Sequence, residues 1–206
     1  MKIGLFGGAF DPVHNAHLFI AEAVRTRASL DRVIFLPART AHHREALRAP
    51  LEDRAAMLRL AIASNPAFAL DLADAGEDAT GYTADLLPRL RAKHSGDELS
   101  FIVGSDSLVR SRWRRLEEIL TSLDAFFVAP RDDIEKSDVD DALADLPSAL
   151  RAKVRYVELP RAAAESATVV RELLERGESV RYLVPEAVWR YLNEHHLYSH
   201  ENAAAK

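Results

Sequence analysis

The chain contains no cysteine, and none of its apolar runs approaches the length of a membrane span. Without cysteine it forms no disulfide and offers no thiolate for catalysis. A spanning helix would need roughly 20 consecutive apolar residues. The first residues lead directly into a short apolar strand, without the basic-plus-apolar leader of a secreted protein. These features predict a cytoplasmic protein without a membrane partner.

An excess of positive charge is also missing. The 206 residues include 27 Lys and Arg against 32 Asp and Glu, so the formal net charge is -5. Because nucleic-acid binding favours a basic face, this balance argues against a nucleic-acid partner. Hydrophobic residues make up 48% of the chain, which is ample for a core. We expect a single domain over 1–206, with a core over 1–160, a small helical part over 161–200 and a frayed tail over 201–206.

Short apolar strands alternate with helical segments along the chain. Strands are expected near 3–6, 33–36, 68–72, 99–103, 125–129 and 154–159, and helices over 15–28, 51–64, 83–93, 166–177 and 186–194. This alternation predicts an α/β fold with a mostly parallel sheet. The acidic stretch 132–145 matches no calcium-binding loop, and we interpret it as a solvated helical insert.

The stretch from Met1 to Leu18, MKIGLFGGAFDPVHNAHL, carries the clearest functional signal. Two glycines follow its strand, where they would let the backbone turn and approach a ligand closely. A helix is expected to begin near Asn15, and a helix start attracts phosphate. His14 and His17 are three residues apart and share a helix face. The stretch therefore predicts a phosphate cradle with two imidazoles, although it is neither a dinucleotide fingerprint nor a P-loop.

Other polar residues are expected just after strands or at helix starts. Asp106 follows a strand at the rim where open α/β sheets bind ligands, although alone it could merely cap a helix. Ser166, Thr168 and Arg171 form a second candidate anion site, again with a capped helix as the alternative. Trp113 lies among arginines, so we expect it to be partly exposed and able to stack on a flat ring.

The stretch GGAFDPVHNAHL resembles the signature of the nucleotidylyltransferase superfamily, which carries H-x-G-H after such a turn. The rest of the chain resembles the bacterial nicotinate-nucleotide adenylyltransferase family, through Tyr82-Thr83, G-x-D-x-L at 104–108, S-A-T-x-x-R at 166–171 and the ending 177–198. The resemblance implies a Rossmann-like nucleotidylyltransferase fold, with a mostly parallel sheet flanked by helices and a small helical C-terminal part.

The implied reaction is transfer of AMP from ATP, with Mg²⁺, to nicotinate mononucleotide, giving deamido-NAD and pyrophosphate. The attacking phosphate is already a nucleophile, so catalysis should consist of positioning and charge stabilisation. By resemblance the catalytic residues are His14, His17 and Arg171. The implied ATP-binding residues are Gly7, Gly8, Ala9, Phe10, His14, His17, Gly104, Asp106, Arg131, Ser166, Thr168 and Arg171. The implied mononucleotide-binding residues are Phe10, Asp11, His43, Arg44, Thr83, Trp113 and Arg114.

Several positions depart from the family pattern. Ala9 replaces a hydroxyl residue, Ala16 replaces the glycine of H-x-G-H, and Ala41 stands where proline is usual. Glu165 replaces an apolar residue, and Arg114 replaces a common aromatic residue or histidine. The spacing from Asp106 to Trp113 is also a residue shorter than usual. Ala9 and Ala16 bear on the rate, a carboxylate at Glu165 could repel the triphosphate, and Arg114 and the shorter spacing bear on the choice of base.

Three alternatives stay open at this point. The acceptor could be nicotinamide mononucleotide or phosphopantetheine, although the chains specific for phosphopantetheine are shorter and lack the Tyr-Thr and G-x-D-x-L motifs. The protein could also be a nucleotide-binding sensor without catalysis, against which the retained His14, His17 and Arg171 argue. Homo-oligomer formation is left open as well.

Overall fold

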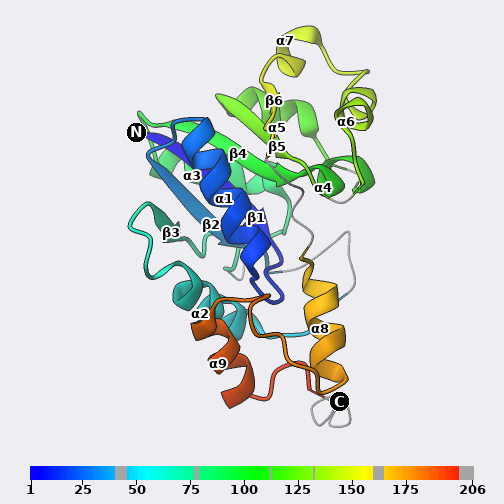
Figure 1. Ribbon diagram of the computed structural model, residues 1–206. Helices are drawn as coiled ribbons and strands as arrows, with labels where there is room; N and C mark the ends of the chain where they lie inside the picture. Colours follow the sequence, from blue (N-terminus) through cyan, green and yellow to red (C-terminus); the bar gives the residue numbers. More distant parts are fainter. Residues whose placement is uncertain (40–45, 77–78, 112, 132, 160–164, 200–206) are drawn as a thin grey trace.

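The computed structural model describes residues 1–39, 46–76, 79–111, 113–131, 133–159 and 165–199. Within these ranges, six strands form one parallel sheet in the order β3-β2-β1-β4-β5-β6 (Figure 1). Their bounds are β1 (Lys2–Gly8), β2 (Arg32–Pro37), β3 (Phe68–Leu70), β4 (Glu98–Gly104), β5 (Ala125–Ala129) and β6 (Val154–Tyr156). The strand order reverses at β1 and β4, and such a switch point is where doubly wound sheets bind ligands. The α/β prediction is confirmed.

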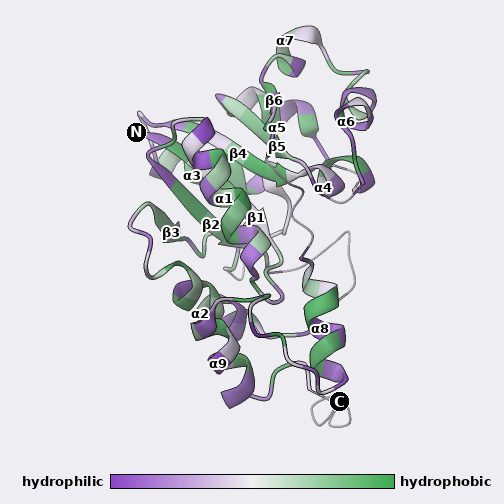
Figure 2. Cartoon of the chain, in the orientation of Figure 1, coloured by the Kyte–Doolittle hydropathy of each residue, from purple (hydrophilic) through white to green (hydrophobic). Residues whose placement is uncertain are grey.

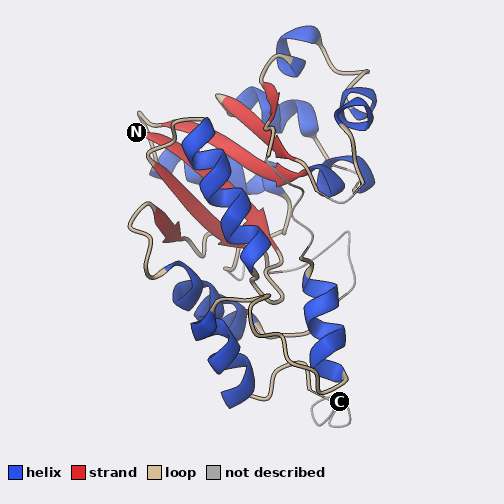
Figure 3. Ribbon diagram, in the orientation of Figure 1, coloured by secondary structure: helices blue, strands red, loops and turns tan. Residues whose placement is uncertain are grey.

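Helices cover both faces of the sheet (Figure 3). Their bounds are α1 (Asn15–Arg27), α2 (Leu51–Ile62), α3 (Thr83–Lys93), α4 (Ser105–Arg110), α5 (Leu116–Ser122), α6 (Lys136–Ala142), α7 (Ser148–Arg151), α8 (Ala167–Glu175) and α9 (Glu186–Glu194). Figure 1 shows α1 lying across one face, with α2, α8 and α9 beyond the end of the sheet. None of the helices among the described residues is long and apolar enough to span a bilayer.

Both faces of the sheet are buried. Because successive side chains of a strand point to opposite faces, each strand contributes to two hydrophobic clusters. In β1, Leu5 belongs to the hydrophobic cluster under α3 and α5, whereas Phe6 belongs to the cluster that includes α1 and α9. The same alternation separates Phe126 from Phe127 in β5. Figure 2 shows the hydrophobic strands at the centre and hydrophilic residues over much of α6. This double burial explains why the strands are continuous apolar runs in the sequence.

Some predicted bounds were too long. β3 ends at Leu70 and β6 at Tyr156, because only three residues of each edge strand pair with their single neighbour. The acidic stretch forms a helix only over α6, and the short α7 after it was not predicted. Val139 of α6 is 2% exposed, so this insert is solvated on one side and packed on the other.

Candidate active site

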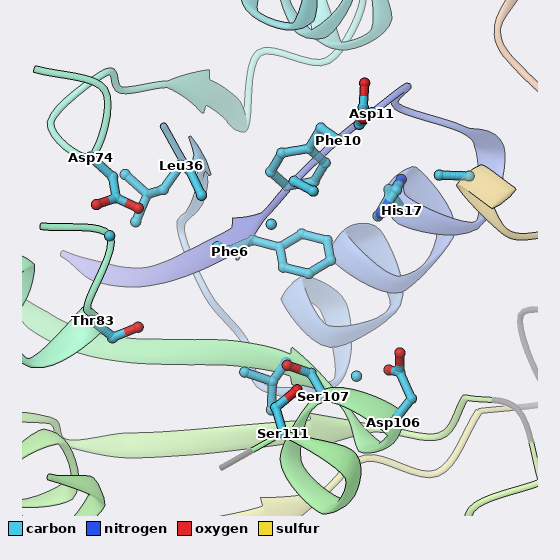
Figure 4. A pocket seen from close by; sticks show the side chains of 18 of the residues that line it. Phe6, Phe10, Asp11, His17, Leu36, Asp74, Thr83, Asp106, Ser107 and Ser111 are labelled. Atoms are coloured by element: carbon cyan, nitrogen blue, oxygen red, sulfur yellow. The ribbon is translucent and has the colours of Figure 1, made fainter. Parts of the chain in front are cut away.

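A cavity of about 530 Å³ opens where the central strands end. Its lining joins the last residues of β1 and β4 to the first turns of α3, α4 and α8. In Figure 4, Asp74 and Thr83 lie on one side of the cavity and His17 and Asp106 on the other, with Phe6 between them. The position agrees with the ligand crevice at the switch point of an open α/β sheet.

Gly7 and Gly8 line the cavity, and both continue β1 instead of turning. The prediction that these glycines make the turn is wrong, since the left-handed residue is Phe10, with a φ of 47°. Their role is close packing: a Cβ on Gly7 would lie 2.9 Å from Cζ of Phe101, and one on Gly8 3.0 Å from Cζ of Phe10. A side chain at either position would need a ring to move.

The N-cap of α1 is His14. Asn15 is the first helical residue, and its side-chain amide donates to the carbonyl of Tyr182 at 2.6 Å. The backbone N–H of His14 donates to Nδ1 of His17 at 3.2 Å. Because this nitrogen accepts, a neutral His17 carries its proton on Nε2, where it can donate to a ligand. His17 lines the cavity and is 8% exposed.

The second imidazole has a different environment. His14 is fully buried, and its ring centroid lies 3.7 Å from that of His17. Neither of its ring nitrogens has a hydrogen-bond partner among the described residues. Burial, with a smaller contribution from Arg131, lowers the pKa of His14 from 6.5 to about 3. His14 is therefore a neutral ring at neutral pH.

The second predicted anion site lies on the same cavity, on α8. Ser166 caps this helix by accepting the N–H of Val169 at 3.2 Å. Thr168 Oγ1 accepts from Nη2 of Arg171 at 3.2 Å, and Arg171 Nη1 donates to the carbonyl of Asp11 at 2.8 Å. Ser166, Thr168 and Arg171 all line the cavity. The start of α1 and the start of α8 are far apart in the chain, yet their residues line one cavity, where both helices can direct N–H donors.

Asp11 is held by the protein itself. The residue is 4% exposed, and its carboxylate accepts from the backbone N–H groups of Arg48 and Ala49 at 2.8 and 3.0 Å. The same carboxylate accepts the hydroxyl of Tyr198 at 2.6 Å. The sequence predicts Asp11 as a mononucleotide ligand, and the structure places it at the edge of the cavity with its carboxylate turned toward these protein donors.

The ends of β4 and β5 are tied together beside the cavity. Ser105 Oγ accepts the N–H of Arg131 at 2.9 Å and donates to its carbonyl at 3.0 Å. Asp106 is 9% exposed and lies in the first turn of α4. A Cβ on Gly104 would run into Oδ1 of Asp106, so glycine there leaves room for this carboxylate. Gly104, Asp106 and Arg131, predicted as ATP ligands, all line the cavity.

Trp113 is half-buried, which confirms its expected partial exposure. Its indole N–H donates to the carbonyl of Ser107 at 2.9 Å, and its ring meets Phe101 and Phe126 edge-on. Arg114 donates to the hydroxyl of Tyr82 at 2.8 Å, with its guanidinium carbon 4.8 Å from the centre of that ring. Tyr82 is the N-cap of α3, so this cation lies beside a helix start.

Thr83 is the first residue of α3 and lines the cavity, and Tyr82 is the N-cap of this helix. Ala9 and Phe10 also line the cavity. His43 and Arg44 lie outside the described residues. Sequence reasoning missed Asp74, Ser107 and Ser111, which line the cavity. Only Ser107 had a signal, since it lies inside the G-x-D-x-L motif.

Sequence reasoning also missed Arg54, which is 1% exposed. Its guanidinium donates to the carbonyls of Ala9 and Ala38 at 2.7 and 2.9 Å and to that of Ala49 at 3.2 Å. It therefore fixes the loops after β1 and β2 without lining the cavity. No local pattern distinguishes it from a solvated helix arginine.

The chain is similar to known proteins over most of its length. A family model described as cytidylyltransferase-like matches residues 5–173. A nicotinate-nucleotide adenylyltransferase of Geobacter sulfurreducens is 40% identical, with 98% of this chain and 100% of the relative covered. A protein of the same name from Symbiobacterium thermophilum is also 40% identical, with 96% and 95% covered. The solved nicotinic acid mononucleotide adenylyltransferase of Plasmodium falciparum, complexed with NaAD, has the same fold, with a TM-score of 0.76 at 19% identity and 96% and 97% of the chains covered.

Proposed function

Because the chain belongs to the cytidylyltransferase-like family and, within it, to the nicotinate-nucleotide adenylyltransferases, we propose that it transfers AMP from ATP to nicotinate mononucleotide. The products are deamido-NAD and pyrophosphate. The observation that carries the proposal is the meeting of the α1 start, with His17, and the α8 start, with Arg171, on one cavity. Two N-terminal helix turns facing one space suit a chain of phosphates.

In the proposed reaction, the 5′-phosphate oxygen of the mononucleotide attacks the α-phosphorus of ATP. The bond from the α-phosphorus to the bridging oxygen breaks, and pyrophosphate leaves with those electrons. The attacking phosphate needs no base to activate it. The protein therefore contributes alignment and donors for the charge that develops on phosphate oxygens.

The donors divide between the two helix starts. His17 Nε2–H, fixed by the bond at Nδ1, is the proposed donor to the α-phosphate. Ser166, Thr168 and Arg171 are the proposed holders of the leaving pyrophosphate. The neutral, buried ring of His14 backs the His17 ring at 3.7 Å and limits its movement.

We assign roles to the other residues that line the cavity from their positions. We propose that Asp106, in the first turn of α4, accepts hydrogen bonds from the ribose hydroxyls of ATP, because ligands of such folds bind just outside the carboxyl ends of the strands. Thr83, Trp113 and Arg114 lie together near the start of α3 and are proposed to receive the pyridine ring.

Divalent metal ions accompany ATP in nucleotidyl transfer, and we propose Mg²⁺ for this chain. Among the described residues no three His, Asp or Glu side chains form a metal-binding group, and the Asp11 carboxylate is occupied by three protein donors. Phosphate oxygens and water are therefore the proposed ligands of the ion. When bound, it neutralises charge on the phosphate oxygens.

The test is turnover of MgATP with nicotinate mononucleotide, with deamido-NAD and pyrophosphate measured separately. Nicotinamide mononucleotide and phosphopantetheine are the comparison acceptors. We expect both products in equal amounts with the nicotinate acceptor. ATP binding without pyrophosphate release from any acceptor would instead support the sensor alternative.

A further inference from the structure

The C-terminal end of the described chain contacts the first loop of the site through Tyr198. The side chain is 9% exposed, and its hydroxyl donates to Oδ1 of Asp11 at 2.6 Å, across 187 residues of sequence. Tyr198 belongs to the same hydrophobic cluster as Phe10 and Val13. The N–H of Leu197, just before it, donates to the carbonyl of Leu192 in α9 at 3.1 Å. Tyr198 is thus held by its own hydroxyl and by the backbone just before it, although it does not line the cavity.

The Tyr198 hydroxyl keeps its proton in this environment. Burial and the Asp11 carboxylate raise the pKa of Tyr198 far above its usual value. A phenol that donates to a buried carboxylate makes a charge-assisted hydrogen bond, which is stronger than a neutral one. The remaining bonds to Asp11 come from the backbone N–H groups of Arg48 and Ala49. Tyr198 is therefore the only side chain among the described residues that bonds the Asp11 carboxylate.

The other side of Asp11 bears directly on the proposed phosphate site. Its carbonyl oxygen accepts from Nη1 of Arg171 at 2.8 Å. Arg171 has one further hydrogen bond within the described residues, from Nη2 to Thr168, while its Nε is buried without a partner. The direction of the Asp11 carbonyl therefore sets the direction of the Arg171 guanidinium. That carbonyl belongs to a residue whose side chain is fixed by Tyr198.

We propose that Tyr198 is a positioning residue for Arg171, acting through Asp11. The hydroxyl fixes the Asp11 side chain, Asp11 presents its carbonyl to Nη1, and the guanidinium is thereby aimed at the distal phosphates of ATP. The proposal deepens the function proposed above and rests on it. It gives the C-terminal segment a part in substrate binding that its distance along the chain does not suggest.

The first test is Tyr198→Phe, which removes one hydroxyl and keeps the ring in the core. Calorimetry should show ATP bound roughly three- to tenfold more weakly. This is less than the roughly 10- to 150-fold expected for loss of a direct bond to a charged group, because Tyr198 acts on the phosphates only through Asp11 and Arg171. AMP lacks the distal phosphates, so its affinity should stay within about twofold. In steady state KM for ATP should rise while KM for the mononucleotide stays constant.

The matched control is Tyr191→Phe. This tyrosine also lies in the C-terminal part and also donates to a carboxylate, Asp53, at 2.8 Å, but it does not line the cavity or contact Asp11. We expect Tyr191→Phe to lower the free energy of unfolding by an amount comparable to that of Tyr198→Phe, while its ATP affinity stays unchanged. If both variants weakened ATP equally, the effect would be general destabilisation and the proposal would be wrong.

A double-mutant cycle identifies the partner. In an Arg171→Ala background, Tyr198→Phe should have no further effect on ATP affinity, because the group that it positions is gone. If the double variant lost ATP affinity by the product of the two single losses, Tyr198 would not act through Arg171. Calorimetry needs no acceptor, so a protein that binds ATP yet forms no deamido-NAD would contradict the proposed function and leave this test readable.

A second measurement uses the unaltered protein and does not depend on the variant folding. Coupling is reciprocal, so ATP must also stabilise the Asp11–Tyr198 contact. Hydrogen exchange of the amides at 192–199 should slow more with ATP than with AMP at equal saturation. Equal protection by the two nucleotides would overturn the proposal.

Discussion

The imidazole rings of His14 and His17 lie 3.7 Å apart at an angle of 32°, yet only His17 lines the cavity. His14 is fully buried and has no hydrogen bond at either ring nitrogen among the described residues. In the function proposed above, His17 is the donor of an Nε2–H to a phosphate, and His14 packs against it as a neutral ring.

The first prediction concerns His17→Ala. A donor that meets charge in the transition state contributes on the order of 3 kcal/mol, so kcat should fall by roughly 100-fold. ATP affinity should fall only a few-fold, because the other donors remain. Turnover and calorimetry on the same preparation measure both quantities, and His195→Ala, on an exposed residue, is the control. A kcat within a few-fold of the parent would remove His17 from the chemistry.

The second prediction concerns stability and pH. In the folded protein the pKa of His14 is about 3 instead of 6.5, so between these values the unfolded chain binds a proton that the folded protein does not. Stability from this group is complete above pH 6.5 and is lost as the pH falls. At pH 5 the loss should be about 2 kcal/mol relative to pH 8.

Urea unfolding of the protein at pH 8 and pH 5 measures this difference. His14→Asn should show a pH-dependent loss smaller by about 2 kcal/mol, while His195→Asn should keep the loss of the parent. If His14→Asn followed the parent at both pH values, the buried ring would not be the titrating group.

The third prediction is that Arg171→Ala weakens ATP more than AMP. The guanidinium lies on α8 beside Thr168, at the helix start proposed for the distal phosphates. An arginine–phosphate contact is charge-assisted, so its loss should cost about 1.5–3 kcal/mol, or roughly 10- to 150-fold. Calorimetry with both nucleotides decides. Equal losses for ATP and AMP would place Arg171 on the α-phosphate or outside the nucleotide site.

The fold was largely predictable because both faces of the sheet are covered. Residues 33–36 and 125–129 are apolar without interruption, which only a buried strand explains well. The short edge strands β3 and β6 were predicted less accurately, because a single neighbour determines where pairing stops. The turn at Phe10 was placed on the glycines, since sequence alone does not show that a ring from β4 fills the space above Gly7.

The site was predictable where local motifs carry it and not where distant residues meet. Asp106 lies just after the end of β4, and Ser166 lies at the start of α8, and the sequence marks both boundaries. Arg54 and Tyr198 are placed by contacts with the loop at 9–11 that no spacing reveals. Asp74 reaches the cavity from the segment after β3, where the sequence has no motif.

The last prediction concerns the pyridine ring, and we expect the acid form to be preferred over the amide. The first amides of α3, at Thr83, and the guanidinium of Arg114 would face a carboxylate with two acceptor oxygens. An amide would turn its NH₂ group toward those donors and leave them unpaired, at about 1–3 kcal/mol. Stacking on Trp113 serves both rings equally. The ratio of kcat/KM values should therefore favour the acid by roughly 5- to 100-fold.

Two charged residues that line the cavity should change the preference for the acid form in opposite directions. Arg114→Gln removes a cation beside Tyr82 and should lower the preference for the acid. Asp74 also lines the cavity, on the same side as Thr83 (Figure 4), and its carboxylate repels the acid form. Asp74→Asn should therefore raise the preference. Measuring kcat/KM for both mononucleotides at fixed Mg²⁺ and salt separates the outcomes. If both substitutions left the ratio unchanged, the pyridine carboxylate would lie away from the start of α3. Trp113 would then be the remaining candidate for contact with the ring.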